Sequence, residues 1–204
     1  MDATQERQTQ VLPLAGVRVL EFVHMVMGPS CGLVLADLGA EVIKIEPPEG
    51  DNTRRLTGTG AGFWATYNRN KKSLALDLKS AAGLEIVKKL LATADVAIEN
   101  FRPGTLEKWN LGYETLAKEN AGLVMLRLSG FGQDGPMRGQ AGFGTVAESM
   151  GGLRYVTGFP DGAPVRPNLS IGDSIAALHG VIGVLTALRH RDRNGKGQVV
   201  DVAL

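Results

Sequence analysis

The sequence predicts an α/β domain built on a mainly parallel sheet with helices on both faces. Short apolar stretches typical of buried strands alternate with stretches of helical periodicity for most of the 204 residues. Twenty-seven glycines, nearly twice the usual share, indicate many tight turns between these elements. Strands that alternate with helices usually pair in parallel, and the connecting helices then cover both faces of the sheet.

Regular structure is predicted to begin with a strand, a helix and a second strand. The apolar stretch 17–22 is typical of a buried strand. Pro29 fits the first turn of the helix expected over 30–38, because its missing N–H needs no partner there. Gly39 ends that helix, and a strand follows at 41–46.

The middle of the chain alternates in the same way after a polar stretch at 49–62, which is predicted to be a long loop. Residues 73–77 alternate apolar and polar side chains as a strand does. Ser80 is predicted to cap a helix whose apolar residues recur every three to four positions. Two further strands are expected at 95–99 and 123–128.

The last part of the chain is predicted to contain an irregular segment, an apolar helix and a final strand. The irregular segment runs from Gly151 to Asp173, the helix covers 174–191 and the strand covers 198–203. At the other end of the chain, residues 1–13 are expected to form an extended or disordered tail.

Composition indicates an ordinary globular protein, with 44% hydrophobic and 21% charged residues. A formal charge of +1 gives no broad field for nucleic acid or an anionic membrane, and no run of about 18 apolar residues is apparent in the sequence. Cys31 is the single cysteine and the three histidines are scattered, so no metal site is expected. We expect a cytoplasmic protein without a nucleic-acid or membrane partner.

Ligands of parallel α/β sheets bind where strands lead into helices, which directs attention to 23–30, 99–108 and 129–145. The segment 68–73 (NRNKKS) has three cations in four residues, consistent with either a solvated surface cluster or a phosphate site. In the segment 99–104 (ENFRPG), Asn100 can hydrogen-bond a ligand amide, although such residues also form ordinary turns.

Asp173 stands directly before the apolar helix, and two interpretations are open. Aspartate is a favoured N-cap residue, so the side chain can serve the helix alone. A carboxylate is also a recognised covalent nucleophile, and Gly172 beside it lets the backbone approach a ligand closely.

Taken together, these segments resemble the class III CoA-transferases, the formyl-CoA transferase family. The resemblance covers nearly everything from Leu14 to Leu204. In chain order the matching segments are LAGVRVLEF at 14–22, GP at 28–29, DLGAEVIKIEPP at 37–48, GD at 50–51, NRNKKS at 68–73, LDLK at 76–79, ADVAIENFRPG at 94–104, GFGQDGP at 130–136, GD at 172–173 and RNGKGQ at 193–198.

The resemblance implies a Rossmann-like large domain over 14–204, a second, smaller domain beyond residue 204, and an interlocked homodimer. It places the nucleophilic aspartate at Asp173, which would carry an aspartyl-CoA thioester, and it implies CoA or acyl-CoA as substrate with no permanently bound cofactor. By charge, Lys71, Lys72 and Arg102 are candidate phosphate partners. The other residues implied to contact CoA are His24, Met25, Leu76, Lys79, Asn100, Phe101 and Lys108.

Two alternatives accompany this expectation. The related acyl-CoA racemases and epimerases carry a histidine base where this chain has Phe143, and a phenylalanine cannot move protons. A catalytically inactive CoA-binding fragment is the other alternative. Gly144 and Val26 replace polar residues of formyl-specific members, which favours a dicarboxylate such as succinate as the donor acid.

Overall fold

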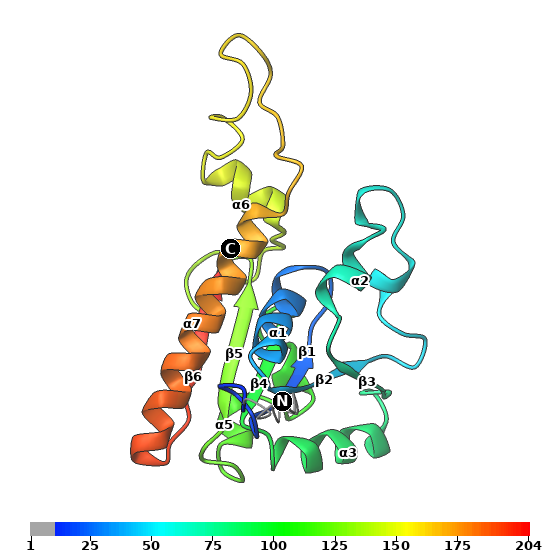
Figure 1. The fold of residues 1–204 in the computed structure, drawn as a ribbon, viewed down its shortest axis with the longest axis vertical. Helices are drawn as coiled ribbons and strands as arrows, with labels where there is room; N and C mark the ends of the chain where they lie inside the picture. Colours follow the sequence, from blue (N-terminus) through cyan, green and yellow to red (C-terminus); the bar gives the residue numbers. More distant parts are fainter. Residues whose placement is uncertain (1–10) are drawn as a thin grey trace, which may run out of the picture.

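A computed structural model describes residues 11–204 and shows a six-stranded sheet in which every neighbouring pair of strands is parallel (Figure 1). The strand order, β3-β2-β1-β4-β5-β6, is that of a Rossmann-like doubly wound sheet, which confirms the predicted fold class. The strands are β1 (Arg18–Phe22), β2 (Glu41–Glu46), β3 (Lys72–Ala75), β4 (Val96–Glu99), β5 (Val124–Ser129) and β6 (Val199–Ala203).

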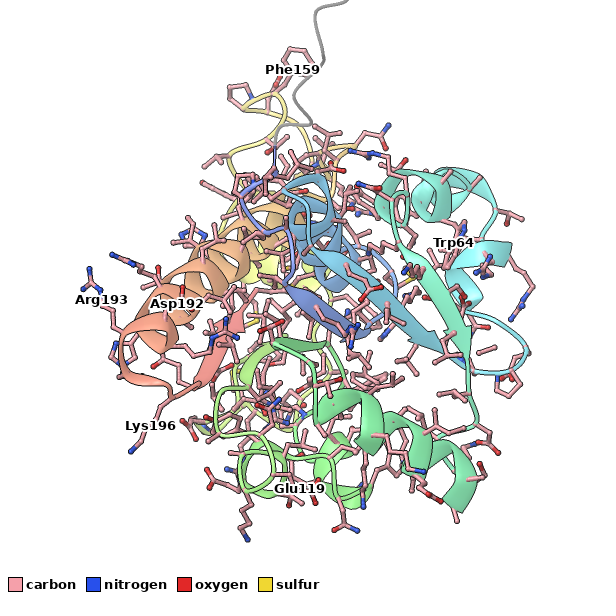
Figure 2. All side chains as sticks on the ribbon, turned by 60° about the horizontal axis from the view of Figure 1, so that its bottom comes forward. Trp64, Glu119, Phe159, Asp192, Arg193 and Lys196 are labelled. Atoms are coloured by element: carbon pink, nitrogen blue, oxygen red, sulfur yellow. The ribbon has the colours of Figure 1, made fainter. Side chains whose placement is uncertain are left out.

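Helices cover both faces of this sheet, as the alternating pattern predicts. Helices α1 (Met27–Asp37) and α7 (Ile171–Asn194) pack on one face, and α3 (Ala81–Leu91), α4 (Thr105–Lys108) and α5 (Tyr113–Leu116) lie on the other. Figure 2 shows the sheet between the blue and orange helices above it and the green helices below it. Alternate residues of the central strands therefore enter two separate apolar cores.

Helix α7 is a core helix of the first face. By length and composition alone it is long and apolar enough to span a membrane. Its small and apolar residues, however, pack against α1, β5 and β6. Gly180 favours the close contact, because a Cβ there would lie 3.0–3.1 Å from Leu126 and the Cys31 Sγ, which is tighter than most side-chain contacts.

Helices α1 and α7 begin earlier than the sequence predicts. Helix α1 starts at Met27 rather than at residue 30, and α7 starts at Ile171 rather than at residue 174. The N-cap of α7 is therefore Ser170, and the interpretation of Asp173 as the N-cap is wrong. Gly195, with φ of 75°, ends α7 in the left-handed conformation that glycine tolerates.

Several short helices were not predicted. The expected loop at 49–62 contains two 3₁₀ helices, Asn52–Arg55 and Gly58–Gly60, and leads into α2 (Phe63–Tyr67). Helix α6 (Gly144–Met150) precedes α7. Helices of three to seven residues are too short to show a repeating apolar stripe, which is the pattern that identifies helices in a sequence.

Residues 151–170, between α6 and α7, form the predicted irregular segment and extend away from the sheet (Figure 1). Phe159 lies at its tip and is 85% exposed (Figure 2). At the other end, residues 1–10 of the expected tail lie outside the described residues, and buried Leu14 is the first residue of the core.

Candidate active site

A cleft of about 320 Å³ lies at the carboxyl ends of the central strands, and we call it the main cleft. It is lined by residues that follow β1, β4 and β5, which are the three places the sequence predicts for ligand binding. Asp173 of α7 also lines it. The predicted site residues that the fold brings together here are His24, Met25, Asn100, Phe101, Arg102 and Asp173.

The turn after β1 is held by its neighbours in a strained shape. Asn100 Oδ1 accepts a hydrogen bond from the His24 N–H at 3.0 Å, and its Nδ2 donates to the His24 carbonyl at 2.9 Å. Met25 follows with φ of 64°, a left-handed conformation that costs energy for a non-glycine residue, and its N–H donates to Thr53 Oγ1 at 3.1 Å. Asn100 therefore positions the wall of the main cleft.

His24 stacks against Phe101 in the lining of the main cleft, with ring centroids 6.1 Å apart and 21° between the ring planes. Burial lowers the pKa of His24, so the imidazole is neutral at physiological pH. The two rings provide a flat surface with one polar edge.

A buried group of charges lies behind this turn. Lys44 Nζ donates to the Val23 carbonyl at 2.5 Å and pairs with Asp51 Oδ2 at 3.0 Å. Lys71, one of the predicted phosphate partners, directs its ammonium to both Glu21 oxygens and to the Pro29 carbonyl. The Lys71 side chain is only 2% exposed and its three donors are all used, so it has none left for a phosphate.

The remaining predicted contacts lie away from the main cleft. Lys72 pairs with Glu41 at the first residue of β2, which is the opposite end of the sheet. Leu76 follows β3 and packs on the second core, whereas Lys79 and Lys108 are exposed in the turn before α3 and at the end of α4. None of these four lines the main cleft.

Asp173 lies in the first turn of α7 with its carboxylate against α6. Burial, reinforced by the negative charge of nearby Glu148, raises the pKa of Asp173 to about 6, while Arg166 acts in the opposite direction. A Cβ at Gly144 would overlap with Asp173 Oδ2. The absence of a side chain at Gly144 is therefore what gives the Asp173 carboxylate its place.

A second pocket, of about 340 Å³, lies on the other side of Asp173. It shares Met25, Phe143 and Asp173 with the main cleft, so the Asp173 carboxylate stands between two cavities. The residues that belong to the second pocket alone are Val26, Leu56, Thr57, Thr59, Gly60, Phe63, Gly144, Thr145, Arg166 and Ser170.

Glu148 was not predicted as a site residue; it is 4% exposed and lies under the first turn of α7. Its Oε1 accepts a hydrogen bond from the Gly172 N–H at 3.4 Å, and its Oε2 has no hydrogen-bond partner among residues 11–204. Such a buried carboxylate is recognisable only once α6 is known to pack against α7.

Arg127 was also missed. Its guanidinium bonds Glu99 at 2.8 Å and Glu107 at 2.7 Å, tying the end of β4 to α4. Glu99 Oε2 in turn accepts from the Phe101 N–H at 2.8 Å. Burial raises the pKa of Glu99, and the charge of Arg127 acts against that rise. These bonds fix the loop that presents Asn100 and Phe101.

Residues 11–204 contain no group of three or more His, Cys, Asp or Glu side chains placed to hold a metal ion. The two cavities are lined by carboxylate, imidazole, guanidinium and hydroxyl groups. A desolvated carboxylate between two cavities, with cations on both sides, is suited to nucleophilic attack on a bound acyl group.

Comparisons with known proteins show the family of the chain. The family model described as CoA-transferase family III matches residues 14–204. The chain is 52% identical over 198 residues to a succinyl-CoA–D-citramalate CoA-transferase and 44% identical over 210 residues to the β subunit of a succinyl-CoA–L-malate CoA-transferase, both from Chloroflexus aurantiacus. These matches cover 94% and 100% of the chain, which spans about half the length of each relative.

Among solved structures, a CAIB/BAIF family protein from Brucella suis superposes with a TM-score of 0.90 at 40% identity. The match covers 95% of this chain and 53% of that one. The chain belongs to CoA-transferase family III, and the resemblance drawn from its motifs is confirmed.

Proposed function

We propose that the protein moves CoA from an acyl-CoA to a free carboxylic acid, with Asp173 as the covalent nucleophile. The observation that carries this proposal is the position of the Asp173 carboxylate between the main cleft and the second pocket. Membership of the CoA-transferase family supports the reaction class, and the citramalate and malate transferases support succinyl-CoA as the donor.

The reaction begins when an Asp173 oxygen attacks the thioester carbonyl, giving a mixed anhydride and releasing CoA thiolate. The thiolate attacks the aspartyl carbonyl, which forms the aspartyl-CoA thioester and releases the first acid as its carboxylate. The second acid attacks this thioester to form a new anhydride and CoA thiolate. Attack of the thiolate on the acyl carbonyl gives the new acyl-CoA and regenerates Asp173.

The surroundings of Asp173 suit this role. A carboxylate whose pKa is raised to about 6 remains mostly ionised at neutral pH but is more basic than an exposed one, and hence more nucleophilic. Phe101 and His24 provide a surface for part of CoA in the main cleft, and Arg102 and Arg138 provide charge for its phosphates. Lys79 and Lys108 lie outside the main cleft and would meet more distant parts of the molecule.

The test is to incubate the full-length protein with a panel of acyl-CoAs, trap the adduct with hydroxylamine or borohydride, and map it by mass spectrometry. We expect modification of Asp173, and we expect Asp173→Ala to lose turnover while CoA affinity stays within about threefold. The matched control is Asp192→Asn at the exposed far end of α7, which should retain full activity (Figure 2). Turnover in Asp173→Ala would refute the assignment.

The same samples test the two alternatives. Exchange of the α-proton in deuterated water without an acceptor acid would instead support a racemase, although Phe143, 61% exposed at the start of α6, supplies no base. CoA binding with neither adduct nor exchange would support a binding fragment.

We also propose a homodimer located in the cytoplasm. Ile175, Leu178 and Ile182 leave an apolar stripe of α7 52–61% exposed, which a second copy would cover. Cys31 is a buried free thiol, as is usual in a reducing compartment. Light scattering of the full-length protein should give twice the mass of one chain, and a monomer would contradict the proposal. Cell fractionation checks the location.

A further inference from the structure

The second pocket has a chemistry of its own. The main cleft has two arginines, Arg102 and Arg138, whereas Arg166 is the one cation among the described residues that line the second pocket. Hydroxyl groups add hydrogen-bonding capacity there, and Val26, Leu56 and Phe63 provide an apolar wall. A ligand that fits this lining has a short apolar chain and one negative charge that the reaction does not consume.

Arg166 is available to such a charge. Its nearest carboxylate is that of Glu148, whose Oε2 lies 4.0 Å from Arg166 Nε, beyond hydrogen-bond length. No hydrogen bond from the Arg166 guanidinium is found within residues 11–204, and its side chain is 46% exposed. A guanidinium offers five N–H donors in a planar fork that matches a carboxylate, so Arg166 is well suited to bind one.

We propose that Arg166 binds the distal carboxylate of a dicarboxylic acid in the second pocket and thereby presents the other carboxyl carbon to Asp173. This inference rests on the function proposed above and names the substrate class of that site. The acyl chain would lie along Val26 and Leu56, and the thioester sulfur would face the main cleft. Arg166 is thus a specificity-determining residue.

The second pocket serves both half-reactions. While CoA stays in the main cleft on Asp173, the first acid leaves the second pocket and the second acid enters the same space. Donor and acceptor acids therefore meet the same guanidinium, and both should be dicarboxylates. A monocarboxylic acid leaves Arg166 without an anionic partner and forgoes a charge-assisted hydrogen bond.

The experiment compares the full-length wild type with Arg166→Gln, using succinyl-CoA or butyryl-CoA as donor and glutarate or monomethyl glutarate as acceptor, so that every pair gives a new acyl-CoA. We expect Arg166→Gln to lower kcat/KM about 10- to 100-fold for succinyl-CoA and glutarate, which present a free distal carboxylate, and to change it less than about threefold for butyryl-CoA and monomethyl glutarate, which lack one. Arg166→Lys keeps the positive charge but not the planar guanidinium, so its kcat/KM should lie between those of the wild type and Arg166→Gln. Arg189→Gln, exposed on α7 and remote from both cavities, is the matched control.

An equal loss with both classes of acid would mean that Arg166 acts only on the folding of the site or on Asp173, and would overturn the proposal. Calorimetric binding of succinate separates this result from failure of the proposed function. Succinate that binds the wild type and not Arg166→Gln supports the pocket even in a protein that turns nothing over. Equal binding to both proteins overturns it.

Discussion

Asn100 holds both backbone polar groups of His24, accepting from the N–H at 3.0 Å and donating to the carbonyl at 2.9 Å. This pair of bonds joins the end of β4 to the turn after β1, directly before the strained Met25. The family resemblance predicts that Asn100 contacts CoA. In the structure the Asn100 amide also holds the turn at His24 and Met25, which forms one wall of the main cleft.

Asn100→Asp should therefore weaken both the fold and the binding of CoA. The carboxylate can still accept from the His24 N–H, but it has no donor for the His24 carbonyl. We expect a loss of about 1–3 kcal/mol in the free energy of unfolding and roughly tenfold lower affinity for CoA, measured by urea denaturation and calorimetry.

Asn120→Asp is the matched control for this change. Asn120 Nδ2 also donates to two carbonyls, those of Leu91 and Ala94, but at the opposite end of the sheet. Its replacement should cost similar stability and leave CoA affinity unchanged. Equal losses of affinity in the two variants would show that general destabilisation, and not the His24 turn, is responsible.

Gly144→Ala should impair catalysis with little effect on the rest of the fold. The added methyl group would overlap with Asp173 Oδ2 and displace the carboxylate. Because a misplacement of about 1 Å can cost roughly 100-fold in rate, we expect a drop of that order in kcat. Gly139→Ala is the control, since a Cβ there has no atom within 4 Å. A Gly144→Ala enzyme as fast as the Gly139→Ala enzyme would contradict the role assigned to Gly144.

The sheet and the position of the main cleft could be predicted because both follow from local patterns. Apolar stretches such as 17–22 and 123–128 are strands in nearly any parallel fold, and the carboxyl ends of such strands meet at one edge. Placing Asp173 beside that edge required the family resemblance as well, because an aspartate before a helix is ordinarily a cap.

The partners of charged side chains could not be predicted in this way. Lys71 belongs to a cationic segment for which the sequence allows a solvated surface cluster. Its ammonium is nevertheless buried against Glu21, fifty residues earlier in the chain. Glu148 approaches the first turn of α7 only because α6, too short to recognise, packs there. Residue type gives the charge, whereas tertiary packing decides what the charge meets.

Cys31 should be unreactive in the folded protein. Its thiol is fully buried and donates to the Ala177 carbonyl at 3.2 Å, and burial raises its pKa far above the usual range. Because the thiolate is the reactive species, an aromatic disulfide reagent should label Cys31 only after the protein unfolds. Labelling in urea should follow the loss of circular dichroism, and rapid labelling in native buffer would show that α1 and α7 separate readily.

The turnover of the wild type should depend on ionisation of Asp173. Protonated Asp173 is not a nucleophile, and its pKa is raised to about 6. We expect kcat/KM for the acyl-CoA to rise with pH through about 6 and to level off above it, as measured by initial rates. A profile that is flat between about pH 5 and pH 7 would assign the nucleophile elsewhere.

Because the pKa of Asp173 is raised in the folded state, ionisation of this group lowers the free energy of unfolding. The ordinary pKa of the group is 3.8, so between about pH 4 and pH 6 the folded state holds a proton that the unfolded state has lost. The contribution of this group to stability is therefore full below about pH 4 and is lost as the pH rises through about 6. Asp173→Asn has no such proton and should be more stable than the wild type at about pH 8, by up to about 3 kcal/mol, since each pKa unit corresponds to about 1.4 kcal/mol. Urea denaturation across this range should show the difference vanish in acid, whereas Asp192→Asn, exposed at the far end of α7, should show no such trend.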